Sequence, residues 1–343
     1  MLKLDSLVAE RKLRAFEMLR NLPDLRLMTR VARLYHEERL IQSEIASKLG
    51  ITQVAVSRLL KKAEENGIIR TTVVTPPGAF AELEETLEQR FGLSQVIIGE
   101  ATSDSEEAVL AAIGSAAAEY LESTVRSGEV IGISSWSSSL LATVEQMHPI
   151  RKLENCIVVQ LLGGIGSPSA EQHANHLAVR LARLVRGEAR FLPVPGVVGS
   201  PGAAKVLLKE PNVSSTIALF EKVSLALVGV GCVEPSALVA SSGNIFLKAE
   251  LEMLQKQGAV GDICLRFFDA KGRPVKGAHD ERVIGMGLER VRRVQRSVAV
   301  CGGKRKLAAI LGAVRGRWIN TLVTDQHTAA RLVNAQPGKA TGG

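Results

Sequence analysis

Residues 42–62 constrain the fold more than any other stretch, because they read as two short helices separated by a tight turn. Gly50 can adopt the positive φ at which the first helix would end, and Thr52 is a good N-cap for the second. The apolar face of the first helix would consist of Ile45, Ala46 and Leu49. The second helix has its own apolar stripe at spacings of three and four, made of Val56, Leu59 and Leu60. This pattern predicts a helix-turn-helix.

The free face of the second helix carries groups that can reach base edges and phosphates from a DNA major groove. The candidate contacts to double-stranded operator DNA are Gln42, Thr52, Gln53, Val54, Ser57, Arg58 and Lys61. An ordinary helical hairpin would need the same apolar stripes, but it would not need polar and basic groups on its open face. DNA binding is therefore the better interpretation.

The flanking residues extend this unit on both sides. Leu27–Leu40 has Val31, Leu34 and Tyr35 in helical register, which predicts a first helix. Ile68–Val74 is rich in β-branched residues and predicts a strand of a small wing. Together these segments indicate a winged helix-turn-helix domain over residues 1–75, and residues 1–22 also look helical.

Length and charge require a second domain and allow a nucleic-acid partner. The 343 residues are too many for one such domain, and 46% hydrophobic residues can build a further large core. Residues 1–75 hold 14 Lys and Arg against 9 Asp and Glu, and residues 276–343 hold 13 against 4. The middle of the chain, residues 76–275, is acidic, with 16 against 22. Basic ends support binding to DNA, although surface solubility explains part of the pattern.

The cysteines and the apolar runs indicate a cytoplasmic protein that does not enter a membrane. The thiols lie far apart, each in or beside an apolar run, without the spacing of a zinc or redox site. They are Cys156, Cys232, Cys264 and Cys301. No run of about 18 apolar residues occurs, and the charged first residues do not resemble a secretory leader.

Beyond Thr75–Gly78, a proline-rich linker, short apolar strands alternate with helices. Phe80–Phe91 would form an amphipathic helix that packs either on its own domain or on a partner subunit. The predicted strands are 96–98, 130–133, 156–161, 225–230, 263–268, 298–301 and 321–324. The predicted helices are 106–126, 139–147, 170–184, 245–257 and 305–314. This alternation predicts a parallel sheet covered on both faces, in a Rossmann-like α/β arrangement.

Ligands of such sheets gather at the carboxyl ends of the strands. Residues 134–139, five serines and one tryptophan, follow one predicted strand and lead into a helix. Hydroxyls and N–H groups at a helix N-terminus suit an anion, although a simple N-cap would also explain the serines. Gly302 and Gly303 precede the basic residues 304–306, which suits a phosphate, although such turns are common.

Two further strand ends carry glycines, and one carboxylate lies near them. Gln160 precedes Leu162-Gly163-Gly164, and Gly229-Val230-Gly231 follows the next candidate strand. Asp262, beside the strand predicted at 263–268, could accept hydrogen bonds from sugar hydroxyls. A turn or capping role explains Asp262 equally well.

The competing class is an enzyme acting on a sugar phosphate, which would need a general base above the sugar carbon. Asp262 and Asp325 are the candidate bases, but neither belongs to a motif with a second catalytic group. His173 and His176 are three apart on a predicted helix, where a metal could bridge them. Because no third ligand is in view, we expect neither a metal nor a cofactor.

Several ordered motifs resemble one family. They are the helix-turn-helix, SSWSSSLLA, VVQLLGG, LPVP at 192–195, GAVGDICLRFFDAKG from Gly258 and VAVCGGKRKLAAILGAVRGRWINTLVTD from Val298. From about Met28 to Val333 the chain is similar to the SorC family of bacterial sugar-responsive transcriptional regulators. The resemblance implies an effector domain related to sugar-phosphate isomerases and glucosamine-phosphate deaminases. It also implies a phosphorylated sugar or polyol as effector and a dimer or tetramer on the operator.

The resemblance assigns roles to single residues. Ser137, Ser138 and Ser139 match the glycine, variable and threonine positions of the family's phosphate loop. Lys306 matches the lysine that meets the phosphate, Gln160 a polar contact to the sugar, and Asp262 a carboxylate near the ligand. The expected effector site comprises Ser135, Ser137, Ser138, Ser139, Gln160, Gly163, Gly164, Asp262, Gly303 and Lys306.

Departures from the family pattern leave the identity of the sugar open. Leu162 stands where many members have Asn, Ser224 where many have Asp, and Ser139 where Thr is usual. The expected organisation is a DNA-binding domain at 1–75, a linker and helix at 76–92 and an effector and oligomerisation domain at 93–343. The expected function is regulation of carbohydrate genes rather than catalysis, with an isomerase-like or deaminase-like enzyme carrying a DNA-binding appendage as the alternative.

Overall fold

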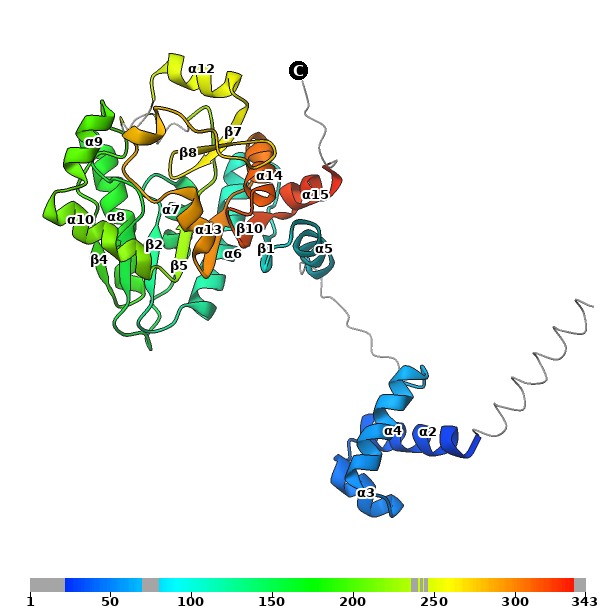
Figure 1. Cartoon of the computed structure of the whole chain (residues 1–343). Coiled ribbons are helices and arrows are strands. Elements are labelled where there is room, and N and C mark those ends of the chain that lie inside the picture. The colour runs from blue at the N-terminus through cyan, green and yellow to red at the C-terminus, as the bar shows by residue number, and fades with distance from the viewer. Residues whose placement is uncertain (1–21, 70–79, 236–239, 241–242, 244–245, 336–343) are drawn as a thin grey trace, which may run out of the picture. The chain divides into compact units, whose positions relative to one another are not determined.

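The computed structural model describes residues 22–69, 80–235, 240, 243 and 246–335, apart from the side chains of 22–23 and 168–173. The chain divides into two compact units, Met1–Val74 and Thr75–Gly343 (Figure 1). The helix predicted at 1–22 and the linker at 75–78 lie outside the described residues, except for Leu22. Of the predicted wing strand only Ile68 and Ile69 are described, and they form a bend.

The first unit contains three helices, α2 (Leu22–His36), α3 (Gln42–Leu49) and α4 (Gln53–Glu65). Their apolar stripes meet in a small core made of Val31, Leu34, Ile45, Ala46, Val56 and Leu60. The first helix begins and ends earlier than the sequence predicted. Tyr35, grouped with that core by helical register, is instead 38% exposed, and its ring meets His36 edge-on.

The turn between α3 and α4 has the geometry that its residues dictate. Gly50 ends α3 in the left-handed region with φ 66°, where a residue with a Cβ is strained. The Ile51 N–H then donates to the Ala46 carbonyl over 3.0 Å. Thr52 caps α4, since its hydroxyl accepts from the Ala55 N–H over 3.1 Å. The turn therefore fixes how α4 leaves α3.

The second unit is built on a seven-stranded parallel sheet with the order β1-β10-β9-β5-β2-β3-β4. The strands are β1 (Gln95–Gly99), β2 (Val130–Ile133), β3 (Ile157–Gln160), β4 (Glu188–Arg190), β5 (Leu225–Val228), β9 (Arg296–Val300) and β10 (Thr321–Asp325). The run of parallel strands confirms the predicted α/β class, and β4 is an addition to it.

Helices cover both faces of this sheet (Figure 1). One face buries α6 (Glu106–Thr124), α7 (Ser138–Gln146) and α8 (Pro168–Leu184). The core on the other face takes side chains from α5 (Ala81–Phe91), α9 (Pro201–Leu207), α10 (Pro211–Ala218), α13 (Leu288–Arg293), α14 (Leu307–Arg315) and α15 (Gln326–Asn334). Short 3-10 helices are η1 (Leu219–Lys222), η2 (Asp280–Arg282) and η3 (Lys304–Lys306).

Helix α5, whose partner the sequence left open, packs on its own unit. The Glu84 and Glu88 carboxylates accept hydrogen bonds from the N–H groups of Ile98 and Val96 over 2.9 and 2.8 Å. These N–H groups belong to β1, an edge strand of the sheet, so α5 covers an edge that would otherwise be open. At its other end, Arg90 donates to the backbone carbonyls at the end of α15.

The strand predicted at 263–268 is wrong, because the chain turns back within it. The segment forms a hairpin of β7 (Ala259–Ile263) and β8 (Arg266–Asp269), which joins β6 (Gly231–Cys232) in a separate antiparallel sheet. The two turn residues, Cys264 and Leu265, have φ of 52° and 60°. A two-residue hairpin of this kind normally carries Asn and Gly, so its apolar sequence looked like one continuous strand.

The predicted helix at 245–257 is also shorter than expected. It is observed as α12 (Lys248–Lys256), and Leu247 before it is extended, with its N–H donated to the Glu250 carboxylate. Helix α14 likewise begins after η3 rather than at Arg305. Among the described residues, no helix is both long and apolar enough to cross a membrane.

Candidate functional site

The open face of α4 presents the residue types that the helix-turn-helix pattern predicted. The side chains of this recognition face are all exposed and follow one another around α4: Gln53, Val54, Ser57, Arg58 and Lys61. Val56 and Leu60 point the other way into the core. Gln42 is half-buried at the start of α3, and the Thr52 hydroxyl is engaged in capping α4. Amide, hydroxyl and cationic groups on one exposed face suit base edges and phosphates.

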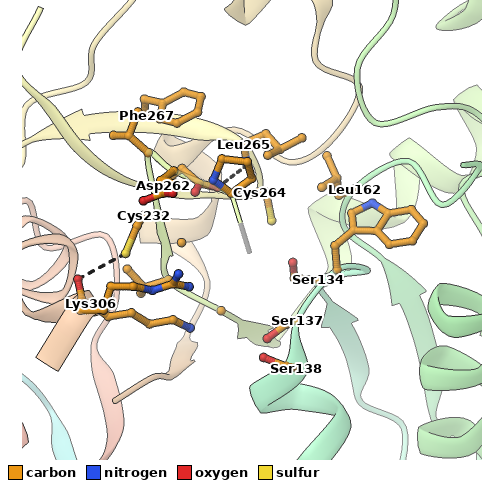
Figure 2. A pocket seen from close by; sticks show the side chains of 18 of the residues that line it. Ser134, Ser137, Ser138, Leu162, Cys232, Asp262, Cys264, Leu265, Phe267 and Lys306 are labelled. Carbon is orange, nitrogen blue, oxygen red and sulfur yellow. Dashed lines mark hydrogen bonds between the residues drawn. The ribbon is translucent and has the colours of Figure 1, made fainter. Parts of the chain in front are cut away.

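A cavity in the second unit lies between β2, the β6-β7-β8 sheet and η3 (Figure 2). Its empty volume is about 910 Å³, a figure that includes the open mouth. The polar lining consists of Ser134, Ser137, Ser138, Asp262, Arg305 and Lys306, with Glu106 and Glu234. The apolar lining includes Trp136, Leu162, Val233, Phe246, Leu251, Leu265 and Phe267.

One end of the cavity is suited to an anion. Ser137 is the N-cap of α7, with its hydroxyl accepting from the Leu140 N–H over 3.3 Å, and Ser138 is exposed beside it. The N–H groups and the dipole of α7 therefore point toward the cavity. Figure 2 shows Lys306, from the end of η3, across the cavity from these serines.

Two glycines allow the segments around the cavity to approach so closely. A Cβ on Gly229 would lie 2.7 Å from the Ser137 hydroxyl oxygen, and one on Gly231 would lie 2.1 Å from Asp262 Oδ1. Both separations are shorter than non-bonded atoms tolerate, so a Cβ at either position would displace the Ser137 or Asp262 side chain. The Gly229-Val230-Gly231 run is thus part of the cavity wall.

Asp262 is the half-buried carboxylate of the cavity. Its Oδ2 accepts a hydrogen bond from the Leu265 N–H over 2.9 Å. Burial raises the pKa of Asp262 to about 6, and the Leu265 N–H and the charge of Lys306 act against this rise. Asp262 can therefore accept hydrogen bonds from hydroxyls when ionised, and its proton comes off near neutral pH.

The opposite side of the cavity is apolar, and its polar atoms are already paired. Trp136, Leu162, Phe246, Leu265 and Phe267 belong to one buried cluster. The Trp136 indole N–H donates to the Gly163 carbonyl over 3.2 Å, and the Ser135 hydroxyl donates to the Leu162 carbonyl over 2.7 Å. This side therefore offers a ligand mainly hydrocarbon contacts.

The turn at Cys264 and Leu265 places strained backbone in the cavity wall. Each non-glycine residue in the left-handed region costs about 1–2 kcal/mol. The Asp262 bond to the Leu265 N–H holds this turn. Burial raises the pKa of the Cys264 thiol to about 12 and also raises that of Cys232, so both thiols keep their protons at neutral pH.

Four of the ten effector residues expected from sequence line the cavity: Ser137, Ser138, Asp262 and Lys306. The other six do not line it. Ser139 is buried within α7, where its carbonyl accepts from the Thr143 hydroxyl over 2.8 Å. Ser135 contacts the Leu162 carbonyl, as described above. The Gly303 N–H donates to the Thr328 hydroxyl over 2.8 Å.

Gln160 and the two glycines after it also support the frame rather than line the cavity. The Gln160 amide oxygen accepts from the Leu192 N–H over 3.0 Å, and its nitrogen donates to the Ala174 carbonyl over 3.3 Å. Gly164 lies directly against that amide, and Gly163 against the Pro195 carbonyl. These three residues fix the loop that carries Leu162.

The sequence placed Ser134 in the serine run and Arg305 in the basic run, but neither was among the ten expected effector residues. The serine run contained a signal for Ser134, and the basic run contained one for Arg305. Phe246 and Leu265 had no signal, because a buried apolar residue at a cavity wall has the same sequence pattern as one in a core.

Asp325, the other candidate base, lies outside the cavity. It is fully buried and caps α15, with Oδ1 accepting from the N–H groups of His327 and Thr328 over 3.0 and 2.9 Å. Among the residues whose side chains are described, no group of three His, Cys, Asp or Glu is arranged to hold a metal ion. His173 lies outside that set.

Comparison with known proteins finds a sugar-binding domain and several transcriptional regulators similar to this chain. Residues 76–334 match a family described as a sugar-binding domain. The chain is 34% identical to the deoxyribonucleoside regulator of Bacillus subtilis, over 88% of this chain and 96% of that one. It is 31% identical to the transcriptional regulator LsrR of Escherichia coli K12, over 90% and 94%. The crystal structure of the full-length sorbitol operon regulator SorC from Klebsiella pneumoniae superposes with a TM-score of 0.67 at 29% identity, covering 91% of this chain and 99% of that one.

Proposed function

Because the chain belongs to the SorC family of sugar-binding transcriptional regulators, we propose that a phosphorylated sugar or polyol controls its binding to operator DNA. The recognition face of α4 reads the operator, and the cavity holds the effector. The relatives are named as regulators of deoxyribonucleoside and sorbitol genes, which supports a role in carbohydrate metabolism.

One observation carries the phosphate assignment: Lys306 and the N-terminus of α7 face the same space from opposite sides. A phosphate placed there would accept hydrogen bonds from the N–H groups at the start of α7 and from Ser138. It would also neutralise the ammonium of Lys306. Hydrogen bonds to charged groups contribute about 1.5–3 kcal/mol each, which is enough to anchor a small ligand.

Asp262 would orient the sugar. Its ionised carboxylate can accept hydrogen bonds from hydroxyl groups, and its Oδ2 is fixed by the Leu265 N–H. The Asp262 carboxylate and the phosphate contacts at Lys306 and the start of α7 would together define the orientation of the bound effector. The sugar would therefore lie between the serine loop and the β7-β8 hairpin.

The mechanism is linkage between the two sites. A symmetric dimer or tetramer presents two recognition helices at the spacing of operator half-sites. An effector that binds one arrangement of the oligomer better than another shifts its affinity for DNA. A decisive shift requires a difference of roughly 5 kcal/mol between the two arrangements. The phosphate clamp supplies part of that difference.

The alternative is a sugar-phosphate isomerase or deaminase, and one observation favours it. A carboxylate with a pKa of about 6 in a ligand cavity has the properties of a general base. The second candidate base, Asp325, is outside the cavity and caps a helix. Incubating the protein with sugar phosphates and following isomerisation or ammonia release would detect turnover, and we expect none.

The proposal is tested by a thermal-shift screen of the full-length protein against phosphorylated and unphosphorylated pentoses, hexoses and polyols. We expect at least one phosphorylated compound to raise the melting temperature, and its free sugar to have no effect. Lys306→Ala should remove that shift. Lys304→Ala is the matched control, because Lys304 is exposed in the same 3-10 helix but does not line the cavity. Shifts with free sugars alone would contradict the phosphate assignment.

A further inference from the structure

The two edges of the parallel sheet differ, because only one of them is covered. At β1, glutamates of α5 accept hydrogen bonds from the outward N–H groups of the strand. The other edge of the sheet is β4 (Figure 1). Within the described part of the chain, β4 pairs with β3 alone. An edge strand with free backbone groups is a template on which another strand can pair.

Ala189, the middle residue of β4, turns its backbone away from β3. The Glu188 N–H donates to the Cys156 carbonyl over 2.9 Å, so the backbone of Glu188 faces β3. The ladder of a parallel pair uses alternate residues of each strand, and Arg190 therefore also faces β3. The N–H and the carbonyl of Ala189 point to the open side. The centre of the edge thus offers one donor and one acceptor.

The side chains of β4 make the strand complementary to itself. Glu188 and Arg190 are two residues apart and lie on one face, where their charged groups meet over 2.6 Å. Both side chains are largely exposed, Arg190 by 51% and Glu188 by 69%. The Ala189 side chain packs against the core on the other face. A strand with opposite charges on either side of a small residue presents the complementary order when its direction is reversed.

One pairing of two such strands satisfies both the backbone and the charges. If a second β4 runs antiparallel with Ala189 opposite Ala189, the two alanines exchange both N–H···O bonds. Each Glu188 then lies opposite Arg190 of the second copy, at a position where side chains approach closely and opposite charges are stabilising. Parallel strands in register would instead set like charges opposite one another. The charges therefore favour a twofold axis through Ala189.

The neighbouring residues limit the size of this contact. Phe191, which is 39% exposed, would lie opposite Gly187 of the second copy, so its ring could cover the glycine. The Phe191 carbonyl already accepts from the Thr216 hydroxyl over 2.9 Å, which confines free backbone pairing to Ala189. A strand of three residues is far smaller than a standard interface, which has about 20–30 residues a side. We therefore expect the association at β4 to be weak.

We propose that β4 is an interface between two copies of this chain, which pair antiparallel about Ala189 and join their parallel sheets into one. The inference rests on the proposed function in one respect, since it names one contact of the symmetric oligomer that would bind the operator. The partner is a second copy because the charge order of β4 fits its own reverse.

The test is sedimentation velocity of the full-length protein over a range of concentrations, with the charges of β4 reversed one at a time. Glu188→Arg and Arg190→Glu each turn the two opposite-charge pairs into like-charge pairs. We expect each variant alone to self-associate about tenfold or more weakly, and so to lose one step of assembly. An equimolar mixture should regain that step, because the arginines of one variant would face the glutamates of the other.

Two further variants separate the contact from general damage. Ala189→Pro removes the outward N–H but no bond to β3, and proline is tolerated at such edge positions. It should weaken self-association as the charge variants do. Glu289→Arg is the matched control, because it reverses an exposed glutamate that pairs with Arg292 outside β4. We expect it to leave the assembly unchanged.

The outcomes are distinct from those of the proposed function. A monomer at every concentration, or unchanged assembly in both charge variants and Ala189→Pro, would overturn the interface. Loss of assembly in both charge variants without recovery in their mixture would also overturn it, since the charges would then not be paired across copies. The thermal shift with phosphorylated sugars reports on the cavity, which contains no residue of β4. The effector proposal therefore stands or falls separately.

Discussion

The recognition face of α4 and the effector cavity are built in opposite ways. The recognition face comes from one continuous stretch of nine residues, and all five of its side chains are exposed over a core of six buried residues. The cavity is assembled from segments that are distant in sequence, and its walls also belong to the core of the second unit. Most of its apolar lining is buried.

This difference determines how substitutions should act. On α4, a surface side chain can be removed without affecting folding, because it makes few contacts within the protein. In the cavity, the residues proposed to bind the effector are also packed in the core of the second unit, so substitutions there should change binding and stability together. The predictions below test whether binding and stability change separately on α4 and together in the cavity, beginning with the largest expected effect.

Removing a core side chain from the small first unit should have the largest effect. Ile45 is fully buried, and Ile45→Ala should cost about 2–5 kcal/mol in the stability of that unit. Differential scanning calorimetry of the whole chain should show this unit unfolding at lower temperature while the second unit is unchanged. Movement of both transitions together would show that the two units do not unfold separately.

Removing an exposed cation from the recognition face should affect DNA binding alone. Arg58→Ala should weaken operator binding by about 1–3 kcal/mol, or roughly 5- to 150-fold, if Arg58 contacts a base. Its melting temperature should match that of the unaltered protein. Arg30→Ala is the control, because it removes the same charge from an exposed position on α2. Fluorescence anisotropy with a labelled operator would measure the affinity of both variants. If Arg58→Ala binds as tightly as Arg30→Ala, Arg58 does not contact the DNA.

The turn between α3 and α4 should be sensitive to a single methyl group. Nothing lies within 4 Å of a Cβ built on Gly50, so any cost of Gly50→Ala comes from its φ of 66°. That strain should destabilise the first unit by about 1–2 kcal/mol. Gly50→Asn should cost less, since asparagine tolerates this conformation. Urea unfolding followed by circular dichroism would compare them, and equal costs would mean that backbone strain is not the cause.

The smallest effect should come from the titration of Asp262. In the folded protein its pKa is about 6, whereas in the unfolded chain it is near 4. Between these values the folded state holds more protons, so the free energy of unfolding falls as the pH rises from 4 to 6. The loss is nearly complete about one pH unit above the folded pKa, near pH 7. Because Asp262 is only half-buried, its ionisation lowers the free energy of unfolding at pH 7 by an amount on the order of 1 kcal/mol.

Asp262→Asn removes this titration and should therefore be the more stable protein at pH 7, with the advantage vanishing near pH 4. The asparagine oxygen can still accept from the Leu265 N–H, so the turn is retained. Urea unfolding at pH 4, 5, 6 and 7 measures the difference, with Glu234→Gln as a second carboxyl of the same cavity. Parallel pH curves for Asp262→Asn and the unaltered protein would contradict the raised pKa.

The same contrast explains which features could be predicted from the sequence. The helix-turn-helix was readable because Gly50, Thr52 and the two apolar stripes lie within 21 residues and act locally. Strands β2, β5, β9 and β10 were readable because a strand buried on both faces is continuously apolar. Ser137, Ser138 and Lys306, which line one end of the cavity, were also among the expected residues, since serines and lysines at helix starts stand out.

The hairpin and the apolar wall could not be predicted, for physical reasons. Cys264 and Leu265 form a turn without glycine or asparagine, so no local preference marked the reversal of the chain. Gln160 looked like a ligand contact because its amide follows a strand, yet that amide is consumed by backbone groups. Phe246 and Leu265 become cavity lining only when β7, β8 and the serine loop meet.

The measurement that tests the central claim most directly is the reciprocity of the two sites. The ligands would be an operator selected from a randomised duplex library and the tightest-binding sugar phosphate of the panel. Operator affinity would be measured with and without the sugar phosphate, and sugar-phosphate affinity with and without the operator. Linkage requires that the effector change operator affinity by the same factor as the operator changes effector affinity. We predict equal factors of at least about fivefold, lost in Lys306→Ala. A factor of one in both directions would show that the cavity does not control DNA binding.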